Sequence, residues 1–398
     1  LSDALVQALI LRHQRNADYG EILDRLEGSN QRTPLAQRIG GDAAFQRGLY
    51  GSSEMVMDGF MHLRKAGILS RLVFDDEPLQ RLLDDERIGL TLREGDAATL
   101  RNAGYLPRVL DQTGLDRMRR FGILPEGSRL RGEHIHVGMD VTLRNDFDDP
   151  QSLKTLDEVI NGRTLCGGRY LQGGFCLGSS LLYEWLRNLD GNDYDGLSMN
   201  RISEVNRLQR GYEALAARQR RKARFFNTCM MATPLGAAVS DALEDGRVVS
   251  GVGGQYDFVS LAGQLDDARS ILMLRATRIV KGRLESNIRW NYGHATIPRH
   301  MRDIFVSEYG IADLRGKSDQ ECVVAMLAIC DAKFQEQLVQ QAVRARKLPP
   351  GFRIPQAWKR NTREDLAARL ALFRERGLLP AYPFGSDFSA LELRLLRV

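Results

Sequence analysis

Long apolar stretches are missing from this chain of 398 residues. Its longest unbroken apolar run, from Cys322 to Cys330, has nine residues, whereas a membrane-spanning helix needs about 20. The chain also lacks an opening charged segment followed by an apolar core, which a secretory signal requires. We therefore expect no membrane span and no secretory signal, and a cytoplasmic protein.

Cysteine is scarce, with 5 residues and no CxxC pair. An odd, widely spaced set fits neither a disulfide framework nor a zinc ribbon, so we expect reduced thiols. The GxSxG elbow and the HExxH helix are also missing, which excludes the common serine hydrolase and zincin signatures. His134 and His136 would share one face of a strand, but the sequence places no third ligand beside them. We expect no metal site.

The chain also lacks a large excess of either positive or negative charge. The chain has 56 Lys and Arg against 51 Asp and Glu, a net charge of +5. This mild excess suits a small anionic ligand as well as nucleic acid. The basic run at 218–224 could contact phosphates, although a charged run that closes a helix is more often a solvated face. We therefore expect no nucleic-acid partner, and the sequence leaves a homo-oligomer open.

The pattern of apolar residues predicts an α/β protein. Short apolar runs alternate with turns over 224–318, with strands expected at 237–243, 247–250, 271–274 and 304–307. A helix is expected over about 182–222, and apolar residues at steps of three and four predict a buried helix face from Val323 to Leu338. Residues 70–165 show weak periodicity and paired acidic clusters, which indicate an insertion.

The sharpest local feature is a strand that runs into three glycines, Gly251, Gly253 and Gly254. Such a loop leaves backbone N–H groups uncovered and lets an anion or an acyl group approach closely. It matches neither GxGxxG nor a Walker loop, and glycine turns after strands are often merely tight. Spacing alone therefore favours a tight turn over a ligand site.

A second segment follows the apolar strand at 304–307 and runs from Glu308 to Ser318, ending in Gly-Lys-Ser. A P-loop needs a glycine five positions before Gly316, but Ile311 stands there. Nucleotide binding by a P-loop is therefore excluded. Glu308, at the end of a strand, is a candidate site carboxylate.

Several motifs together resemble the acetyl-CoA hydrolase/transferase family, which includes acetate, butyrate, succinate and 4-hydroxybutyrate CoA-transferases. The matching segments occur in the family's order: GLYGSSEMVMDG at 48–59, GGFCLGSSLLY at 173–183, GVGGQYDFV at 251–259, SILMLRATR at 270–278 and SEYGIADLRGKSDQE at 307–321. The resemblance covers about 48–65 and 170–340 and points to the family's C-terminal domain.

The resemblance implies an open three-layer α/β/α sheet of the CoA-transferase type with a helical or irregular insertion. It also implies coenzyme A or an acyl-CoA as substrate or ligand, with no tightly bound cofactor. Gly251, Gly253, Gly254 and Gln255 would line the CoA thioester, and Gly310 would lie in the oxyanion region. In this family a glutamate attacks the thioester and forms covalent intermediates.

That glutamate is missing here. The family pattern Asn-Ser-Ala-[Ile/Leu]-Glu-[Val/Ile]-Asp-x-x-Gly corresponds to residues 227–236, which places Met231 at the nucleophile position. A thioether cannot attack a thioester as a carboxylate does. Glu54 and Glu308 are the candidates for activating water in its place. We expect a divergent branch of the family that has lost the usual nucleophile.

The resemblance also sets the expected domains. Residues 1–47 are expected to be a helical remnant or linker of a preceding N-terminal domain, because they are too few to form the family's N-terminal half. Residues 48–345 are expected to be the CoA-transferase-like domain, with the insertion at about 70–165, and residues 346–398 a C-terminal extension. Two functions remain: an acyl-CoA hydrolase or transferase, and a non-catalytic domain that binds CoA or a metabolite. Nucleic-acid binding rests on charge alone.

Overall fold

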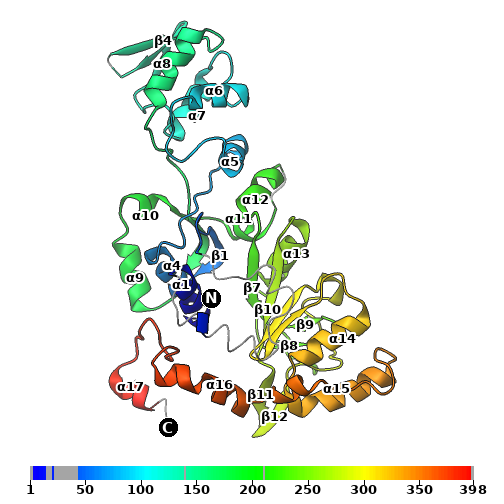
Figure 1. The fold of residues 1–398 in the computed structure, drawn as a ribbon. Helices are drawn as coiled ribbons and strands as arrows, with labels where there is room; N and C mark the ends of the chain where they lie inside the picture. Colours follow the sequence, from blue (N-terminus) through cyan, green and yellow to red (C-terminus); the bar gives the residue numbers. More distant parts are fainter. Residues whose placement is uncertain (1–2, 15–19, 22–43, 139, 209–210, 396–398) are drawn as a thin grey trace.

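The computed structural model describes residues 3–14, 20–21, 44–138, 140–208 and 211–395 (Figure 1). The strands are β1 (Gly51–Val56), β2 (Arg129–Arg131), β3 (His134–Val137), β4 (Val141–Arg144), β5 (Leu171–Cys176), β6 (Leu197–Met199), β7 (Arg224–Thr228), β8 (Met231–Ala232), β9 (Ala238–Val239), β10 (Arg269–Met273), β11 (Thr277–Val280), β12 (Arg283–Ser286), β13 (Ile304–Ser307) and β14 (Gly310–Asp313).

The helices outnumber the strands and are mostly short. They are α1 (Asp3–His13), α4 (Asp58–Lys65), α5 (Glu77–Asp84), α6 (Asp96–Asn102), α7 (Gln112–Arg120), α8 (Pro150–Ile160), α9 (Ser180–Arg187), α10 (Gly191–Asp195), α11 (Ile202–Asn206), α12 (Glu213–Gln219), α13 (Gln255–Gln264), α14 (Asp319–Ala328), α15 (Ala332–Arg344), α16 (Arg363–Glu375) and α17 (Ala390–Leu395), with 3₁₀ turns η1 (Arg299–Met301) and η2 (Gln356–Arg360). No helix of the described residues is long and apolar enough to cross a membrane.

Two sheets with parallel strands form the framework. One has the order β1-β5-β6 and the other β14-β13-β10-β7, in which β14 alone runs antiparallel. Helix α13 contacts β7 and β10, and α14 contacts β14. The α/β class is therefore confirmed, with the strands divided between two sheets. The sheet of β7, β10 and β13 presents the residues that follow all three strands at one edge, which is where parallel sheets place their sites.

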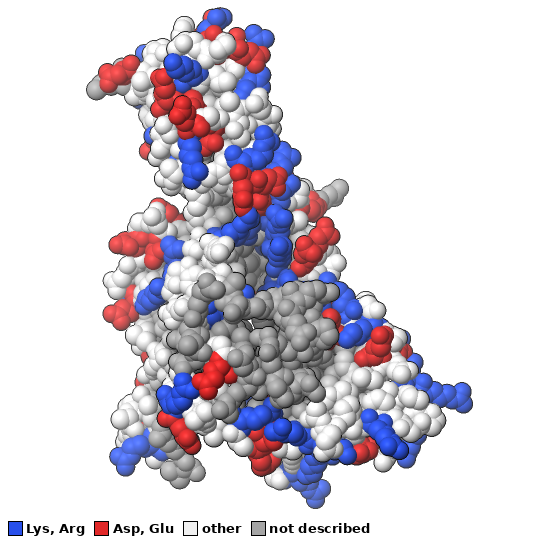
Figure 2. All heavy atoms as spheres, in the orientation of Figure 1, with Lys and Arg blue, Asp and Glu red and all other residues white. Residues whose placement is uncertain are grey.

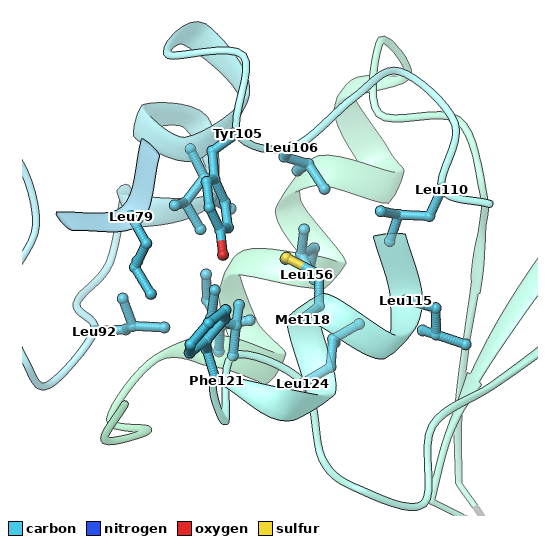
Figure 3. Packing of buried hydrophobic residues seen from close by; sticks show 14 of the residues in the cluster. Leu79, Leu92, Tyr105, Leu106, Leu110, Leu115, Met118, Phe121, Leu124 and Leu156 are labelled. Atoms are coloured by element: carbon cyan, nitrogen blue, oxygen red, sulfur yellow. The ribbon is translucent and has the colours of Figure 1, made fainter. Parts of the chain in front are cut away.

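Residues 70–165, the expected insertion, form a compact unit with its own core. A cluster of buried apolar side chains runs from Phe74 to Leu165 and is separate from the clusters beneath the two sheets. Figure 1 shows α5 to α8 and the small β2-β3-β4 sheet projecting away from the rest. Figure 3 shows Tyr105 and Phe121 packed among other buried side chains of this cluster, such as Leu92. The insertion is therefore well packed, although its sequence shows little periodicity.

Phe121→Ala is expected to destabilise the insertion alone. Phe121 is 2% exposed, and its ring lies edge-on to Phe74 with centroids 6.1 Å apart. Removing a buried phenylalanine costs about 3–5 kcal/mol. Hydrogen exchange should quicken across 74–165 and stay unchanged in β10 and β13, with Val109→Ala, at an exposed position, as the control. Equal acceleration in both regions would show that they unfold as one unit.

The C-terminal extension returns to the β1-β5-β6 side of the molecule. The Phe384 ring stacks on His62 of α4 with centroids 4.0 Å apart. The Asp387 carboxylate accepts hydrogen bonds from the backbone N–H of Ser180 (2.9 Å) and from its hydroxyl (2.7 Å). At the other end, α1 belongs to the expected 1–47 segment, and the rest of that segment lies mostly outside the described residues.

Several predicted elements need correction. The helix expected over 182–222 is wrong, because α9 to α12 are separate helices and β6 lies among them. The helix expected through 323–338 is interrupted at 329–331, where the Asp331 side chain caps α15. The strands expected at 271–274 and 304–307 correspond to β10 and β13. The strand pair expected at 237–243 and 247–250 is wrong, because only β9 forms, it pairs with β8, and no strand lies at 247–250. The expected turn is present, since Leu243 N–H donates to Arg247 O (2.8 Å) and Ala242 forms an isolated bridge with Val248.

Candidate active site

The glycine loop lies directly before α13 and has free backbone donors. In the described part of the chain, the N–H groups of residues 251 to 254 have no hydrogen-bond acceptor. Gly253 has a φ of +58°, a conformation that favours glycine. Gly254, the residue before α13, is buried. The loop can therefore donate several hydrogen bonds to a carbonyl oxygen or an anion.

The Glu54 carboxylate lies against this loop. A methyl group built onto Gly254 would overlap the Glu54 carboxylate, so glycine is required there for the two to meet. Glu54 is on β1, some 200 positions earlier in the chain. The structure thus brings together two elements that the sequence analysis named separately.

Asn206 holds Glu54 in this position. Its side-chain N–H₂ donates to Glu54 Oε1 and, at 3.2 Å, to Asp257 Oδ2. Asp257 is in the first turn of α13 and also pairs with Arg207 (3.2 Å). One amide therefore links the carboxylate on β1 to the helix that follows the glycine loop.

Small residues in β5 let α11 approach closely enough to place Asn206. A methyl group on Gly174 would overlap the Ile202 side chain at the start of α11. On the other side, the buried Arg220 donates to the carbonyl oxygens of Glu204 (2.8 Å) and Val205 (3.0 Å). Burial lowers the pKa of this guanidinium. Sequence reasoning missed Asn206, since a lone asparagine in an expected helix gives no signal.

Two buried side-chain oxygens beside the loop are unpaired. Gln255 donates to Thr228 O at the end of β7 (2.6 Å), but its own Oε1 has no partner among the described residues. The same is true of Asn206 Oδ1. Buried polar atoms are usually satisfied, so each unpaired one calls for an explanation. A bound ligand or water molecule would supply the missing donors.

Met231 is enclosed. It is 1% exposed and lies on β8 opposite Val239, which is equally buried. Its neighbour Cys229 is no substitute nucleophile, because burial raises the pKa of this thiol to about 12 and leaves it protonated at neutral pH. Neither sulfur is placed to attack a thioester.

Glu308 and Gly310 lie at the same edge of the sheet but have structural partners. The Glu308 carboxylate accepts the N–H of Ala276 at 2.8 Å and so fastens the chain that leaves β10. Gly310 begins β14 and pairs with Ser307. Of the two candidate glutamates, Glu54 is the one in contact with the glycine loop.

Asp241 anchors the chain that enters the loop. Its backbone oxygen accepts from the N–H groups of Val249 (2.8 Å) and Ser250 (3.1 Å). Its carboxylate accepts from the Thr296 hydroxyl and lies 2.9 Å from His294 Nε2. These hydrogen bonds, that of Thr296 first, lower the pKa of Asp241.

Asp241→Asn is expected to flatten the acid limb of the stability curve. A carboxyl whose folded pKa is lowered stabilises the protein above its unfolded pKa of about 3.9, and this contribution is lost as the pH falls through the folded pKa. Urea midpoints at pH 6 and pH 3 should differ less for Asp241→Asn than for the wild type. Asp266→Asn, at an exposed position, should keep the wild-type difference, and an equal reduction in both variants would contradict this role.

The basic run at 218–224 is largely engaged within the protein. Arg218 pairs with Glu77 (2.7 Å), Arg220 is 4% exposed, and Arg224 donates to Asp267 O (2.7 Å). Figure 2 shows acidic and basic side chains interspersed over the visible face. Arg221 and Lys222 are exposed, so the run presents two of its five cations to solvent.

The two histidines do lie on a strand, β3, where His136 Nδ1 is 3.0 Å from the Thr142 hydroxyl. Within the described ranges no group of three or more His, Cys, Asp or Glu side chains could hold a metal ion. The histidine pair therefore has no further ligand there.

These residues form a site in a parallel α/β domain. A glycine loop with free backbone N–H groups precedes a helix, and a carboxylate lies against that loop. Residues 178–342 match the family model of the acetyl-CoA hydrolase/transferase C-terminal domain. The match confirms, for these residues, the resemblance to the acetyl-CoA hydrolase/transferase family.

Individual relatives agree. A probable butyrate:acetyl-CoA coenzyme A-transferase from Syntrophomonas wolfei is 32% identical over 119 residues, 29% of this chain and 26% of that protein. A 4-hydroxybutyrate coenzyme A transferase from Clostridium kluyveri is 29% identical over 117 residues, 29% of this chain and 27% of that protein. The chain thus matches about a quarter of the length of each.

Solved structures give a weaker match. RipA from Yersinia pestis aligns with a TM-score of 0.39 at 24% identity, over 49% of this chain and 42% of RipA. A 4-hydroxybutyrate CoA-transferase from Porphyromonas gingivalis aligns with a TM-score of 0.33 at 22% identity, over 44% of this chain and 37% of that one. At these scores the likeness adds nothing to what the strand order already shows.

Proposed function

We propose that the glycine loop binds the thioester end of an acyl-CoA and that Glu54 activates water to hydrolyse it. The contact between Glu54 and Gly254 carries the proposal, because it places a carboxylate beside free backbone donors. The family supports coenzyme A as the ligand class. Met231 at the position of the family's glutamate favours attack by water over attack by the protein.

The proposed hydrolysis proceeds through the following bond changes and proton transfers. A water oxygen bonds to the thioester carbonyl carbon while its proton passes to the Glu54 carboxylate. The carbonyl oxygen becomes an oxyanion that accepts hydrogen bonds from the loop N–H groups. The C–S bond then breaks, and the CoA sulfur takes the proton from Glu54. The products are free CoA and a carboxylic acid.

One observation favours a second candidate, a domain that binds CoA without turnover. The 1% exposure of Met231 leaves the family's nucleophile position closed as well as chemically inert. In this case Glu54 and Asn206 would only orient the ligand. The two candidates share the binding site and differ in whether the C–S bond breaks.

Incubation with acetyl-CoA separates the two. The hydrolase should release free thiol above the buffer rate and show no mass increase on the intact protein. The binding domain should release none, and acetyl-CoA should still raise its melting temperature. A covalent acyl or CoA adduct on Glu54 or Glu308 would contradict both and show a transferase with a relocated nucleophile.

A further inference from the structure

A cavity of about 690 Å³ lies at the opposite edge of the β7-β10-β13 sheet from the glycine loop. It is lined by the second half of α13, by η1 and by the segment between β14 and α14. Its wall includes Ser270, near the start of β10, and Asp303, just before β13. Its volume is in the range of small-molecule sites, about 300–1,000 Å³.

Basic side chains dominate the charge of this cavity. Four cationic residues line it, Arg299, Arg302, Arg315 and Lys317, together with His300. Asp303 pairs with Arg269 and with Arg315, each at 2.6 Å. Asp319 pairs with Lys347 at 2.6 Å and lies 3.7 Å from Arg299 and 3.9 Å from Arg302. Four cations against two carboxylates still leave an excess of positive charge in the lining.

Two polar groups in the wall have no partner in the described part of the chain. The half-buried Lys317 has no hydrogen-bond or ion-pair partner for its ammonium among those residues. Ser270 is 3% exposed, and its hydroxyl oxygen is likewise unpaired there. A buried hydroxyl without a partner is uncommon. Both groups can donate hydrogen bonds to an anion.

The segment Gly316-Lys317-Ser318, which does not fit a P-loop, contributes to the cavity wall instead. The Ser318 hydroxyl is occupied with Glu321 in the cap of α14, so it is not free to hold a metal ion as a P-loop serine does. Lys317 is left facing the cavity. The segment therefore offers a point charge without the nucleotide-binding loop.

We propose that this cavity binds a phosphorylated small molecule, with the Lys317 ammonium and the Ser270 hydroxyl donating to its phosphate oxygens. The ligand is separate from the thioester at the glycine loop, because the two sites lie at opposite edges of the sheet and α13, about 15 Å long by its residue count, runs between them. The site does not depend on the proposed hydrolysis.

Calorimetric titration of the full chain with inorganic pyrophosphate and with ADP tests this site. Lys317→Ala should weaken binding about 10-fold or more, since it removes a charge-assisted hydrogen bond. Ser270→Ala should weaken binding several-fold with an unchanged melting temperature, because the lost hydroxyl has no partner among the described residues. Lys154→Ala, the same charge change on α8 of the insertion, should bind as the wild type does.

The same titration tests whether the cavity and the glycine loop bind their ligands independently. Pyrophosphate should bind Gly254→Ala with wild-type affinity and should bind in the presence of saturating CoA. The proposal is overturned if neither probe binds at millimolar concentration, if Lys317→Ala and Lys154→Ala bind equally, or if CoA displaces pyrophosphate competitively.

Discussion

Met231→Glu is expected to unfold the region around β8 and β9 instead of restoring transferase chemistry. The side chain is 1% exposed beside the equally buried Val239. An unpaired carboxylate at such a site costs several kcal/mol, about 3–5 kcal/mol by analogy with broken buried ion pairs. This would consume a large part of the stability of an ordinary domain.

Two further variants separate charge from size. Met231→Gln has the shape of glutamate without its charge, and Met231→Leu keeps the volume and should cost less than about 1.5 kcal/mol. Urea unfolding should rank them leucine, glutamine, glutamate from most to least stable. Glutamate as stable as glutamine, with a trappable glutamyl-CoA adduct, would show that the position opens to ligand.

Glu54→Gln is expected to slow thioester hydrolysis by about 10²–10⁴-fold, the usual contribution of a general base. The glutamine keeps an oxygen to accept the Asn206 hydrogen bond, so the loop and Asn206 should stay in place. The substitution removes only the capacity to take a proton. The melting temperature should therefore change little while the rate of CoA release falls.

Glu308→Gln is the matched control. Its side-chain oxygen can still accept the Ala276 N–H, and its carboxylate does not touch the glycine loop. Hydrolysis should stay within a few-fold of the wild-type rate. Equal losses in both variants would remove the distinction drawn here between a site glutamate and a structural one, and a loss in Glu308→Gln alone would reverse it.

The strands β10 and β13 and the position of the glycine loop could be predicted because their signals are local. An apolar run of four residues became β13, and the three glycines form the loop before α13. Asn206 could not be predicted, because its place depends on how closely α11 approaches Gly174. Such tertiary contacts leave no periodic trace in the sequence.

The sequence did not predict the packed core of the insertion, for a related reason. Its helices have between seven and eleven residues, too few turns for a clear apolar period. Side chains from several such helices and a small sheet together fill one core. The interruption at 329–331 escaped prediction as well, because the apolar spacing continues across the break while Asp331 begins a new helix.

Titration of acetyl-CoA into the wild-type chain and into Gly254→Ala tests the central claim most directly. The added methyl group would overlap the Glu54 carboxylate and displace it from the loop. We predict saturable binding to the wild type and a loss of affinity of at least about tenfold, or about 1.4 kcal/mol, in the variant. Gly263→Ala, where a methyl group meets nothing within 4 Å, should bind as the wild type does. Absence of acetyl-CoA binding by the wild type, or equal affinity in Gly254→Ala and Gly263→Ala, would contradict the account.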